Sequence, residues 1–175
     1  KLARWRGKNL GIIYQSFELM PTLNLVENVM LPPDFLGSYQ PTISKQKALE
    51  LLDLVDIAEH AYKVPAHISG GQKQRVAIAR ALTQGPKMIL ADEPIASLDP
   101  LSAQVVMQSL REINERDGLP VICNLHTLDT ARSYCDRVVG MRQGKLVFDG
   151  PPAELNATAV RDIYGADHEI GESMT

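Results

Sequence analysis

The sequence predicts an α/β protein built on a parallel β-sheet. Short apolar runs, each of the length of a buried strand, alternate with amphipathic or capped helical segments. Such alternation favours parallel pairing, because a parallel connection needs a crossover segment and a helix usually supplies it. With 175 residues, 45% of them hydrophobic, the chain is long enough for one domain with its own core.

The first half of the chain has one predicted strand and two predicted helices. The apolar run 10–14 is typical of a buried strand, and residues 25–30 are expected to form an apolar turn within a stretch interrupted by prolines. Ser44 is the expected cap of the first helix. Ser69 is the natural N-cap of the second helix, from Gly70 to about Thr83. The buried stripe of the first helix has the i, i+3, i+4, i+7 spacing and comprises Ala48, Leu51, Leu52 and Val55.

The second half alternates between strand and helix patterns. Gly118 is the expected stop of the longest helix, because glycine adopts the left-handed conformation that ends many helices. Short helices are expected beyond Pro151. The expected elements, in chain order, are a strand at 87–92, a helix at 101–116, a strand at 119–125, a helix at 128–134, a strand at 137–142, a turn at 143–144 and a strand at 146–148.

Two adjacent carboxylates, Asp92 and Glu93, end the strand at 87–92. Open parallel sheets bind ligands at the carboxyl ends of their strands, so this position suits a site. Asp92 could hold Mg²⁺ directly or through water, since this ion prefers hard oxygen ligands and often takes one carboxylate. Glu93 could then polarise an attacking water as a general base. The pattern is common in proteins, so its meaning depends on the residues around it.

The segment Ser69-Gly70-Gly71-Gln72 opens the predicted helix at 70–83. The free N–H groups and the positive dipole end of a helix favour anions, and glycines let the backbone approach a phosphate closely. By itself, Ser-Gly-Gly is as often a plain turn.

The run from Ile68 to Arg75, followed closely by the run from Met88 to Glu93, resembles the ATP-binding cassette (ABC) ATPases. The resemblance implies a P-loop NTPase-like α/β fold, in which a helical subdomain is inserted into a parallel sheet. It divides the chain into a catalytic core at 1–15 and 81–150, a helical signature subdomain at 16–80 and a C-terminal tail at 151–175.

Three further residues match this family in order. The resemblance implies that Gln15 is the glutamine that senses Mg²⁺ or the attacking water and links to the transport subunits. It implies that His126 is the switch histidine at the γ-phosphate, and that Asp99 belongs to a loop that contacts a partner cassette. The implied cofactors are ATP and Mg²⁺. The residues implied to bind nucleotide are Ser69, Gly70, Gly71, Gln72 and Asp99.

The resemblance also implies partners. In this family the signature of one cassette covers the γ-phosphate held by the other, so a second ABC ATPase subunit is expected, together with transmembrane permease subunits and a substrate-binding protein. The expected location is the cytoplasmic face of the cell membrane. A net charge of −3 argues against nucleic acid as a main partner. No apolar run approaches the roughly 18 residues of a membrane span.

A Gly-x-x-x-x-Gly-Lys-Ser/Thr phosphate loop does not occur in the sequence. In the family it resembles, this loop lies upstream of the glutamine, so it would precede Lys1. A parallel sheet without the strand of that loop leaves apolar surface and backbone uncovered. We therefore expect the 175-residue chain alone to be poorly stable and not to hydrolyse ATP.

Two kinds of cassette are similar to different parts of the chain. Residues 121–129, 134–140 and 148–155 are most similar to the ATPases of phosphonate importers, whereas residues 17–23 and 27–32 are more like lipoprotein-release and peptide-export cassettes. The longer match favours phosphonate import. A truncated, non-hydrolysing regulatory or vestigial cassette is the remaining alternative. The residues that argue against it, because hydrolysis needs them together, are Asp92, Glu93, Gln15 and His126.

Overall fold

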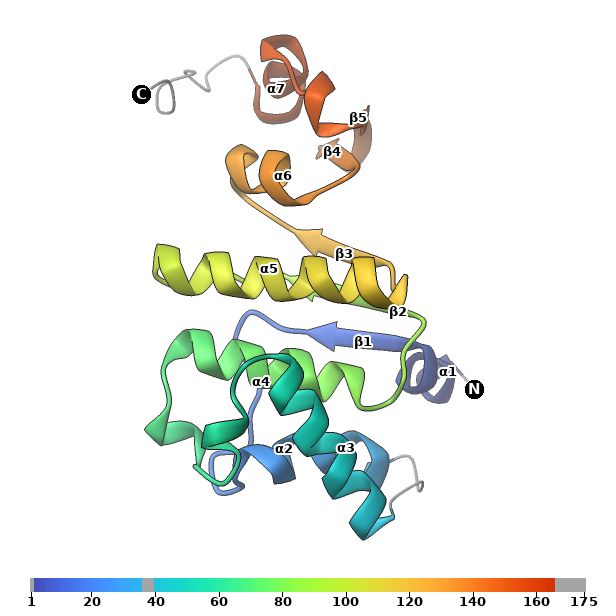
Figure 1. Ribbon diagram of the computed structural model, residues 1–175. Coiled ribbons are helices and arrows are strands. Elements are labelled where there is room, and N and C mark those ends of the chain that lie inside the picture. Colours follow the sequence, from blue (N-terminus) through green and yellow to red (C-terminus); the bar gives the residue numbers. More distant parts are fainter. Residues whose placement is uncertain (1, 36–39, 166–175) are drawn as a thin grey trace. The chain divides into compact units, whose positions relative to one another are not determined.

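The computed structural model describes residues 2–35 and 40–165 (Figure 1). The chain divides after Asn124 into two compact units, and each unit is described here by itself. Within the described residues, no helix is long and apolar enough to cross a lipid bilayer.

A three-stranded parallel sheet, in the order β1-β2-β3, forms the centre of the first unit (Figure 1). Its strands are β1 (Leu10–Ile13), β2 (Met88–Asp92) and β3 (Val121–Asn124). The register places Ile13 opposite Ala91, and Asp92 opposite Asn124. Because the carboxyl ends of parallel strands meet at one edge, the segments that follow β1 and β2 leave the sheet from the same edge. The predicted α/β fold class is confirmed.

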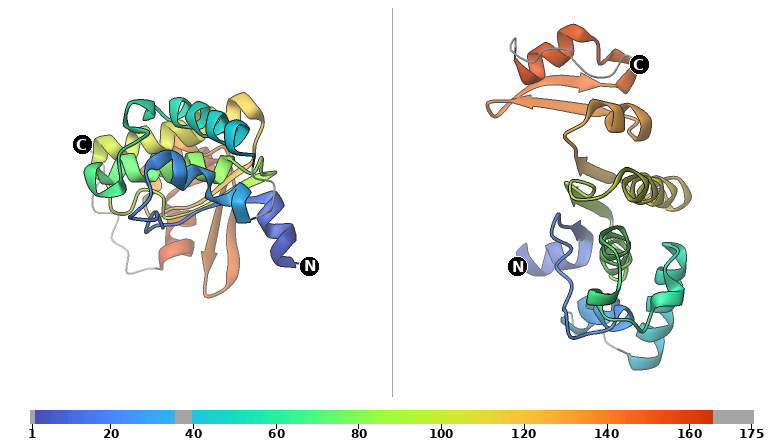
Figure 2. Two further views of the ribbon diagram at one scale, coloured as in Figure 1. Left: turned by 90° about the horizontal axis from the view of Figure 1, so that it is seen from below. Right: turned by 90° about the vertical axis from the view of Figure 1, so that its left-hand side faces the viewer.

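Five α-helices and two short 3₁₀ turns complete the described part of the first unit. Helix α4 packs against α2, α3, α5 and β1, and its central residues Val76 to Ala79 are fully buried. Its apolar central segment therefore belongs to the core of the unit. Figure 2 shows that α4 and α5 lie on the same face of the sheet. The elements are α1 (Leu2–Asn9), α2 (Leu25–Phe35), α3 (Pro41–Leu54), η1 (Ala58–His60), η2 (Pro65–His67), α4 (Gly70–Leu82) and α5 (Pro100–Asp117).

Two helices of this unit were not predicted from the sequence. Helix α1 occupies residues to which no element was assigned, and the expectation of an apolar turn at residues 25–30 is wrong, because α2 occupies them. Asn24 and Glu27 cap α2 reciprocally: Glu27 N–H donates to Asn24 Oδ1 at 2.9 Å, and Asn24 N–H donates to Glu27 Oε2 at 2.8 Å. The nearby prolines, which usually break helices, hid this signal.

The start of α3 also differs from the prediction. Ser44 does not cap this helix, which begins at Pro41 with Gln40 as its N-cap residue. Proline at the first helical position is a start signal in its own right, since its missing N–H would be unpaired there in any case. Ser44 is buried inside the first turns, where its hydroxyl accepts a hydrogen bond from the N–H of Gln40 at 3.2 Å.

The second unit consists of a hairpin and short helices. Strands β4 (Val138–Arg142) and β5 (Lys145–Gly150) pair antiparallel through Gln143 and Gly144, which both have positive φ, as a tight two-residue hairpin turn requires. Arg137 and Asp149 form a bidentate ion pair beside the hairpin, with N–O distances of 2.6 and 2.7 Å. The predicted helices before and after the hairpin are present as α6 (Leu128–Tyr134), η3 (Pro152–Glu154) and α7 (Ala157–Tyr164), and α7 packs on both strands.

Candidate functional site

Gln15 is exposed in a turn directly after β1. The next two residues, Phe17 and Glu18, adopt left-handed backbone conformations with φ of 60° and 50°. Such values carry strain in residues other than glycine. The Ser16 hydroxyl donates to Glu18 Oε1 at 2.6 Å. From helix α4, Arg80 donates to the carbonyl oxygen of Phe17 at 2.7 Å and to that of Glu18. The structure therefore fixes the backbone that follows Gln15 from a distant part of the chain.

Asp92 ends β2, and its carboxylate is exposed. The Asn124 side-chain amide donates to Asp92 Oδ1 at 3.1 Å from the neighbouring strand, where the register places the two residues opposite each other. Sequence analysis did not single out Asn124. Its position as a polar residue at the end of an apolar strand, opposite the carboxylate strand, is the signal that could have identified it. Asn124 restrains the orientation of the Asp92 carboxylate.

Glu93 is half-buried and has a left-handed backbone conformation, with φ of 46°. This conformation is expected to cost about 1 kcal/mol or more in a residue with a side chain. Its carbonyl oxygen accepts a hydrogen bond from the N–H of Ala96 at 3.3 Å, which bends the chain sharply away from the sheet. Backbone strain of this kind is typical of functional positions.

The side chains around Asp92 suit a magnesium ion better than a metal ion that needs several protein ligands. Among residues 2–35 and 40–165, no group of three or more His, Cys, Asp or Glu side chains could hold a metal. Mg²⁺ commonly takes one or two carboxylates and fills its octahedron with phosphate oxygens and waters. One exposed carboxylate at a strand end is consistent with that mode of binding.

Ser69 begins helix α4 with a complete capping box. Its hydroxyl accepts a hydrogen bond from Gln72 N–H at 3.2 Å, and Gln72 Oε1 accepts one from Ser69 N–H at 2.8 Å. The predicted N-cap is confirmed. The Gln72 side chain therefore has a structural function at this helix start, besides any contact with a ligand.

The two glycines of this helix start have different surroundings. A Cβ at Gly71, which is buried, would lie 2.6 Å from Ser102 Cβ on α5. A Cβ at Gly70 would lie 3.4 Å from Leu98 and 3.9 Å from the ring of Phe17, which are ordinary contacts. Helix packing therefore requires a glycine at position 71, while position 70 has space for a methyl group.

Asp99 is the N-cap of α5, and its Oδ1 accepts a hydrogen bond from Ser102 N–H at 3.0 Å. Hydrogen bonds from the Ser102 side chain and backbone hold the pKa of the Asp99 carboxyl below its usual value. The side chain of Leu98, the preceding residue, lies near Gly70, where a Cβ would be 3.4 Å from it. The Asp99 segment and the start of α4 are therefore adjacent in the folded chain.

His126 belongs to the second unit, where it is exposed between β3 and α6. Its carbonyl oxygen accepts a hydrogen bond from the Tyr164 hydroxyl of α7 at 3.5 Å. The tail helix thus contacts the backbone of this histidine.

The structure brings three of the predicted segments together in the first unit. The Gln15 turn, through Phe17, and the Asp99 segment, through Leu98, both reach Gly70 at the start of α4. The strand that carries Asp92 ends at the same sheet edge as β1. Sequence analysis missed Arg80 and Asn124, which join these segments through hydrogen bonds.

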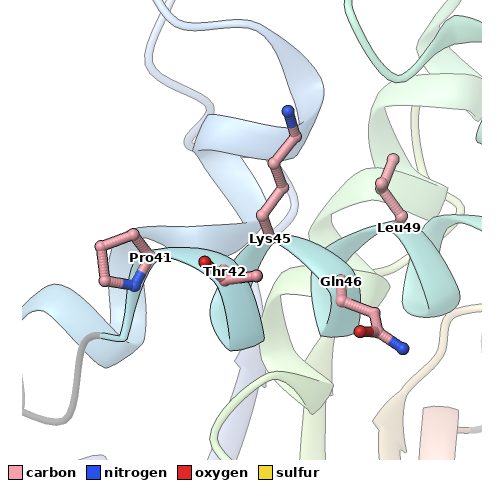
Figure 3. Close-up of a pocket in the computed structure, with 5 residues that line it drawn as sticks. All are labelled: Pro41, Thr42, Lys45, Gln46 and Leu49. Carbon is pink, nitrogen blue, oxygen red and sulfur yellow. The ribbon is translucent and has the colours of Figure 1, made fainter.

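A hollow on helix α3 lies apart from these segments (Figure 3). Nearby, the Lys45 ammonium lies 5.4 Å from the centre of the Tyr62 ring. All of the residues that line the hollow come from one helix, so it is a surface feature of α3. They are Pro41, Thr42, Lys45, Gln46 and Leu49.

Comparison with protein families gives one match, in which the ABC transporter family model covers residues 1–96. The phosphonates import ATP-binding protein of Roseobacter denitrificans is 53% identical to the chain, and that of Ruegeria pomeroyi is 54% identical. Each alignment covers 98% of the chain, and the chain spans 65% of the length of each relative.

Solved structures with the same fold include two cassettes. The ADP- and phosphate-bound dimer of the cassette MJ0796 has a TM-score of 0.75 and 36% sequence identity, over 86% of this chain and 66% of that one. The cbiO1 protein of Clostridium perfringens, part of the cbiONQ transporter complex, has a TM-score of 0.77 and 29% identity, over 87% of this chain and 61% of that one.

Proposed function

We propose that this chain, which belongs to the ABC transporter family, is the greater part of an ATP-binding subunit. The proposed subunit hydrolyses ATP to drive phosphonate import. The observations that carry the proposal are the strand end at Asp92 and Glu93 and, in the same unit, a signature helix with a complete capping box. The phosphonate assignment rests on relatives above 50% identity that carry that description.

The proposed roles follow from position and chemistry. Asp92 holds the magnesium of bound Mg-ATP, directly or through water, and Asn124 restrains its carboxylate for that task. The ion supplies charge neutralisation on the phosphate oxygens. Glu93 accepts a proton from the attacking water, a role worth about 10²–10⁴ in rate. Gln15 orients this water or the ion, and His126 contacts the γ-phosphate.

The signature segment acts on nucleotide held by a second subunit. Ser69, Gly70 and Gly71 present the N-terminal end of α4, whose N–H groups favour an anion. Because Gly70 lies close to Leu98, the residue before Asp99, we place both segments on one surface that a partner cassette would face. We therefore propose a homodimer or heterodimer of cassettes.

The remaining partners are proposed from the family. They are transmembrane permease subunits and a substrate-binding protein, with the ATPase on the cytoplasmic face of the membrane. Residues 16–80 are the proposed helical signature subdomain, residues 1–15 and 81–150 belong to the catalytic core, and residues 151–175 form the tail.

The 175-residue chain lacks a phosphate loop in its sequence, so we propose that it does not hydrolyse ATP by itself.

The test uses the full-length product of the gene, compared with residues 1–175 alone. Full-length protein should hydrolyse ATP, and Glu93→Gln should reduce kcat by about 10² or more. Glu112→Gln, which changes an exposed carboxylate on α5, is the matched control and should leave kcat unchanged. Equal ATPase activity in wild type and Glu93→Gln would remove Glu93 from the mechanism.

The substrate is tested separately in proteoliposomes that contain the permease. A binding protein loaded with an alkylphosphonate should stimulate ATP hydrolysis and uptake. Stimulation by a lipoprotein or a peptide instead would overturn the phosphonate assignment and leave the ATPase assignment standing.

A further inference from the structure

Helix α4 holds the turn after Gln15 through the side chain of Arg80. The planar guanidinium donates to two successive carbonyl oxygens, those of Phe17 and Glu18. Those two residues are the ones with left-handed backbone, so Arg80 binds the strained part of the turn. A forked donor suits two neighbouring acceptors, whereas a lysine ammonium is a single point of charge.

The positive charge of the Arg80 guanidinium strengthens these hydrogen bonds. Burial lowers the pKa of its guanidinium, while the negative charge of Glu18 opposes that effect. An arginine stays charged in proteins, so its hydrogen bonds to the carbonyls are charge-assisted and stronger than neutral ones. Loss of the guanidinium would leave the two carbonyl oxygens without this donor.

Other contacts attach the same stretch of chain to α4. At the base of β1, a Cβ on Gly11 would lie 3.0 Å from the carbonyl oxygen of Ala81, so strand and helix are in close backbone contact. At the other end of α4, the ring of Phe17 lies near Gly70. The carbonyl of Phe17 is therefore bound by Arg80, and its ring lies near the start of α4.

The far end of the loop is fixed independently. Asn28 of α2 is fully buried, and its side chain accepts from Met20 N–H and donates to the carbonyls of Met20, Leu23 and Asn24. Asn28 thus fixes the end of the loop at residues 20–24, and Arg80 fixes the end next to Gln15.

A second arginine of α4 makes the same arrangement elsewhere. Arg75 donates to the carbonyls of Val55 at 3.0 Å and of Asp56 at 2.7 Å, and Asp56 also has a left-handed φ, of 53°. That turn carries no predicted site residue. Arg75 therefore provides a control for the exchange experiment: it is an arginine of the same helix that also binds two successive carbonyl oxygens, though through one nitrogen and with one left-handed acceptor residue.

We propose that Arg80 is a positioning residue for Gln15. It joins the turn that carries the glutamine to the signature helix, so that the position of this turn relative to the helix stays fixed. The consequence for hydrolysis rests on the proposed function, while the attachment itself does not.

The attachment is tested by amide hydrogen exchange on the full-length protein. Arg80→Met keeps the apolar stem and removes all donors, and it should speed exchange at Phe17 and Glu18 at least tenfold. Arg75→Met should leave those amides unchanged and instead speed exchange near Asp56. Arg80→Lys should give an intermediate result and guards against a folding defect. Unchanged exchange at residues 17 and 18 in Arg80→Met would overturn the proposal.

The consequence is tested by ATP hydrolysis in the same variants. Arg80→Met should lower kcat about tenfold or more with little change in KM, whereas Glu112→Gln should keep kcat. In a Gln15→Ala background, Arg80→Met should add little further loss, because the two residues act as a unit. Independent, additive losses would overturn the link to Gln15. If wild-type protein lacks ATPase activity, the proposed function fails, and the exchange experiment still decides the attachment.

Discussion

The close approach of α4 and α5 makes replacement of Gly71 by alanine the sharpest test of the described packing. A Cβ at this position would lie 2.6 Å from Ser102 Cβ and 2.7 Å from Ser102 Oγ. Carbon atoms in good contact are about 3.5–4.0 Å apart, so the helices would have to separate locally by about 1 Å. Neither helix can move freely, because the centre of α4 is fully buried in the core.

The expected magnitude combines two opposing terms. Overpacking of this kind costs about 1–3 kcal/mol. Alanine in place of glycine returns at most about 1 kcal/mol of helix propensity. The net fall in the free energy of unfolding of Gly71→Ala therefore lies between about 0 and 3 kcal/mol, and we expect about 1–2 kcal/mol, the middle of that range. In urea, with a slope of about 2 kcal/mol per molar, the midpoint should fall by about 0.5–1 M.

Two further variants make the test specific. Gly70→Ala places its Cβ at ordinary distances from Leu98 and Phe17, so its stability should stay within about 0.5 kcal/mol of wild type. Ser102→Gly removes the side chain that the new methyl group meets. Added to Gly71→Ala, it should recover at least half of the lost stability, after its own effect is subtracted. Equal stability of the two alanine variants, or purely additive effects with Ser102→Gly, would refute the argument from close approach.

Three other predictions concern separate residues. Asn124→Ala should raise the Mg²⁺ concentration for half-maximal binding of a fluorescent ATP analogue about tenfold, because Asp92 loses its orienting donor. An unchanged Mg²⁺ concentration would show that this hydrogen bond does not contribute to Mg²⁺ binding. The hydrogen bond from Arg137 lowers the pKa of Asp149 in the folded state, so the ion pair stabilises the hairpin above the unfolded pKa of about 3.9 and is lost as the pH falls through the folded value. Exchange of hairpin amides, corrected for intrinsic rates, should therefore accelerate on acidification in wild type and much less in Asp149→Asn. The Gln74 side chain is fully buried, and neither amide atom has a hydrogen-bond partner in the described part of the chain, so Gln74→Met should raise the free energy of unfolding of the 175-residue chain by about 1 kcal/mol. A fall instead would mean that the amide has a partner.

Local signals predicted the elements that depend on local chemistry. The bounds of α6 agree with the prediction at both ends, and Gly118 ends α5 with a φ of 62° as expected of a left-handed cap. Ser69 caps α4 because the capping box lies within four consecutive residues. The α2 capping box is equally local, but prolines within the same stretch outweighed it in the prediction.

The connections between segments could not be predicted in the same way. Arg80 lies 62 and 63 residues from its two acceptors, and Asn124 lies 32 residues from Asp92. No periodicity or cap motif encodes such pairs, since they depend on which elements become neighbours after folding. The sequence pattern could place Gln15 after a strand, but it contained no sign of what holds the following turn.

At position 93, the residue that suits the left-handed backbone differs from the residue that the proposed chemistry needs. Glycine would adopt this conformation without strain, so Glu93→Gly would relieve the backbone there while removing the carboxylate. Under the proposed function, ATP hydrolysis requires a carboxylate at this position, so the strained backbone and the side chain are retained together.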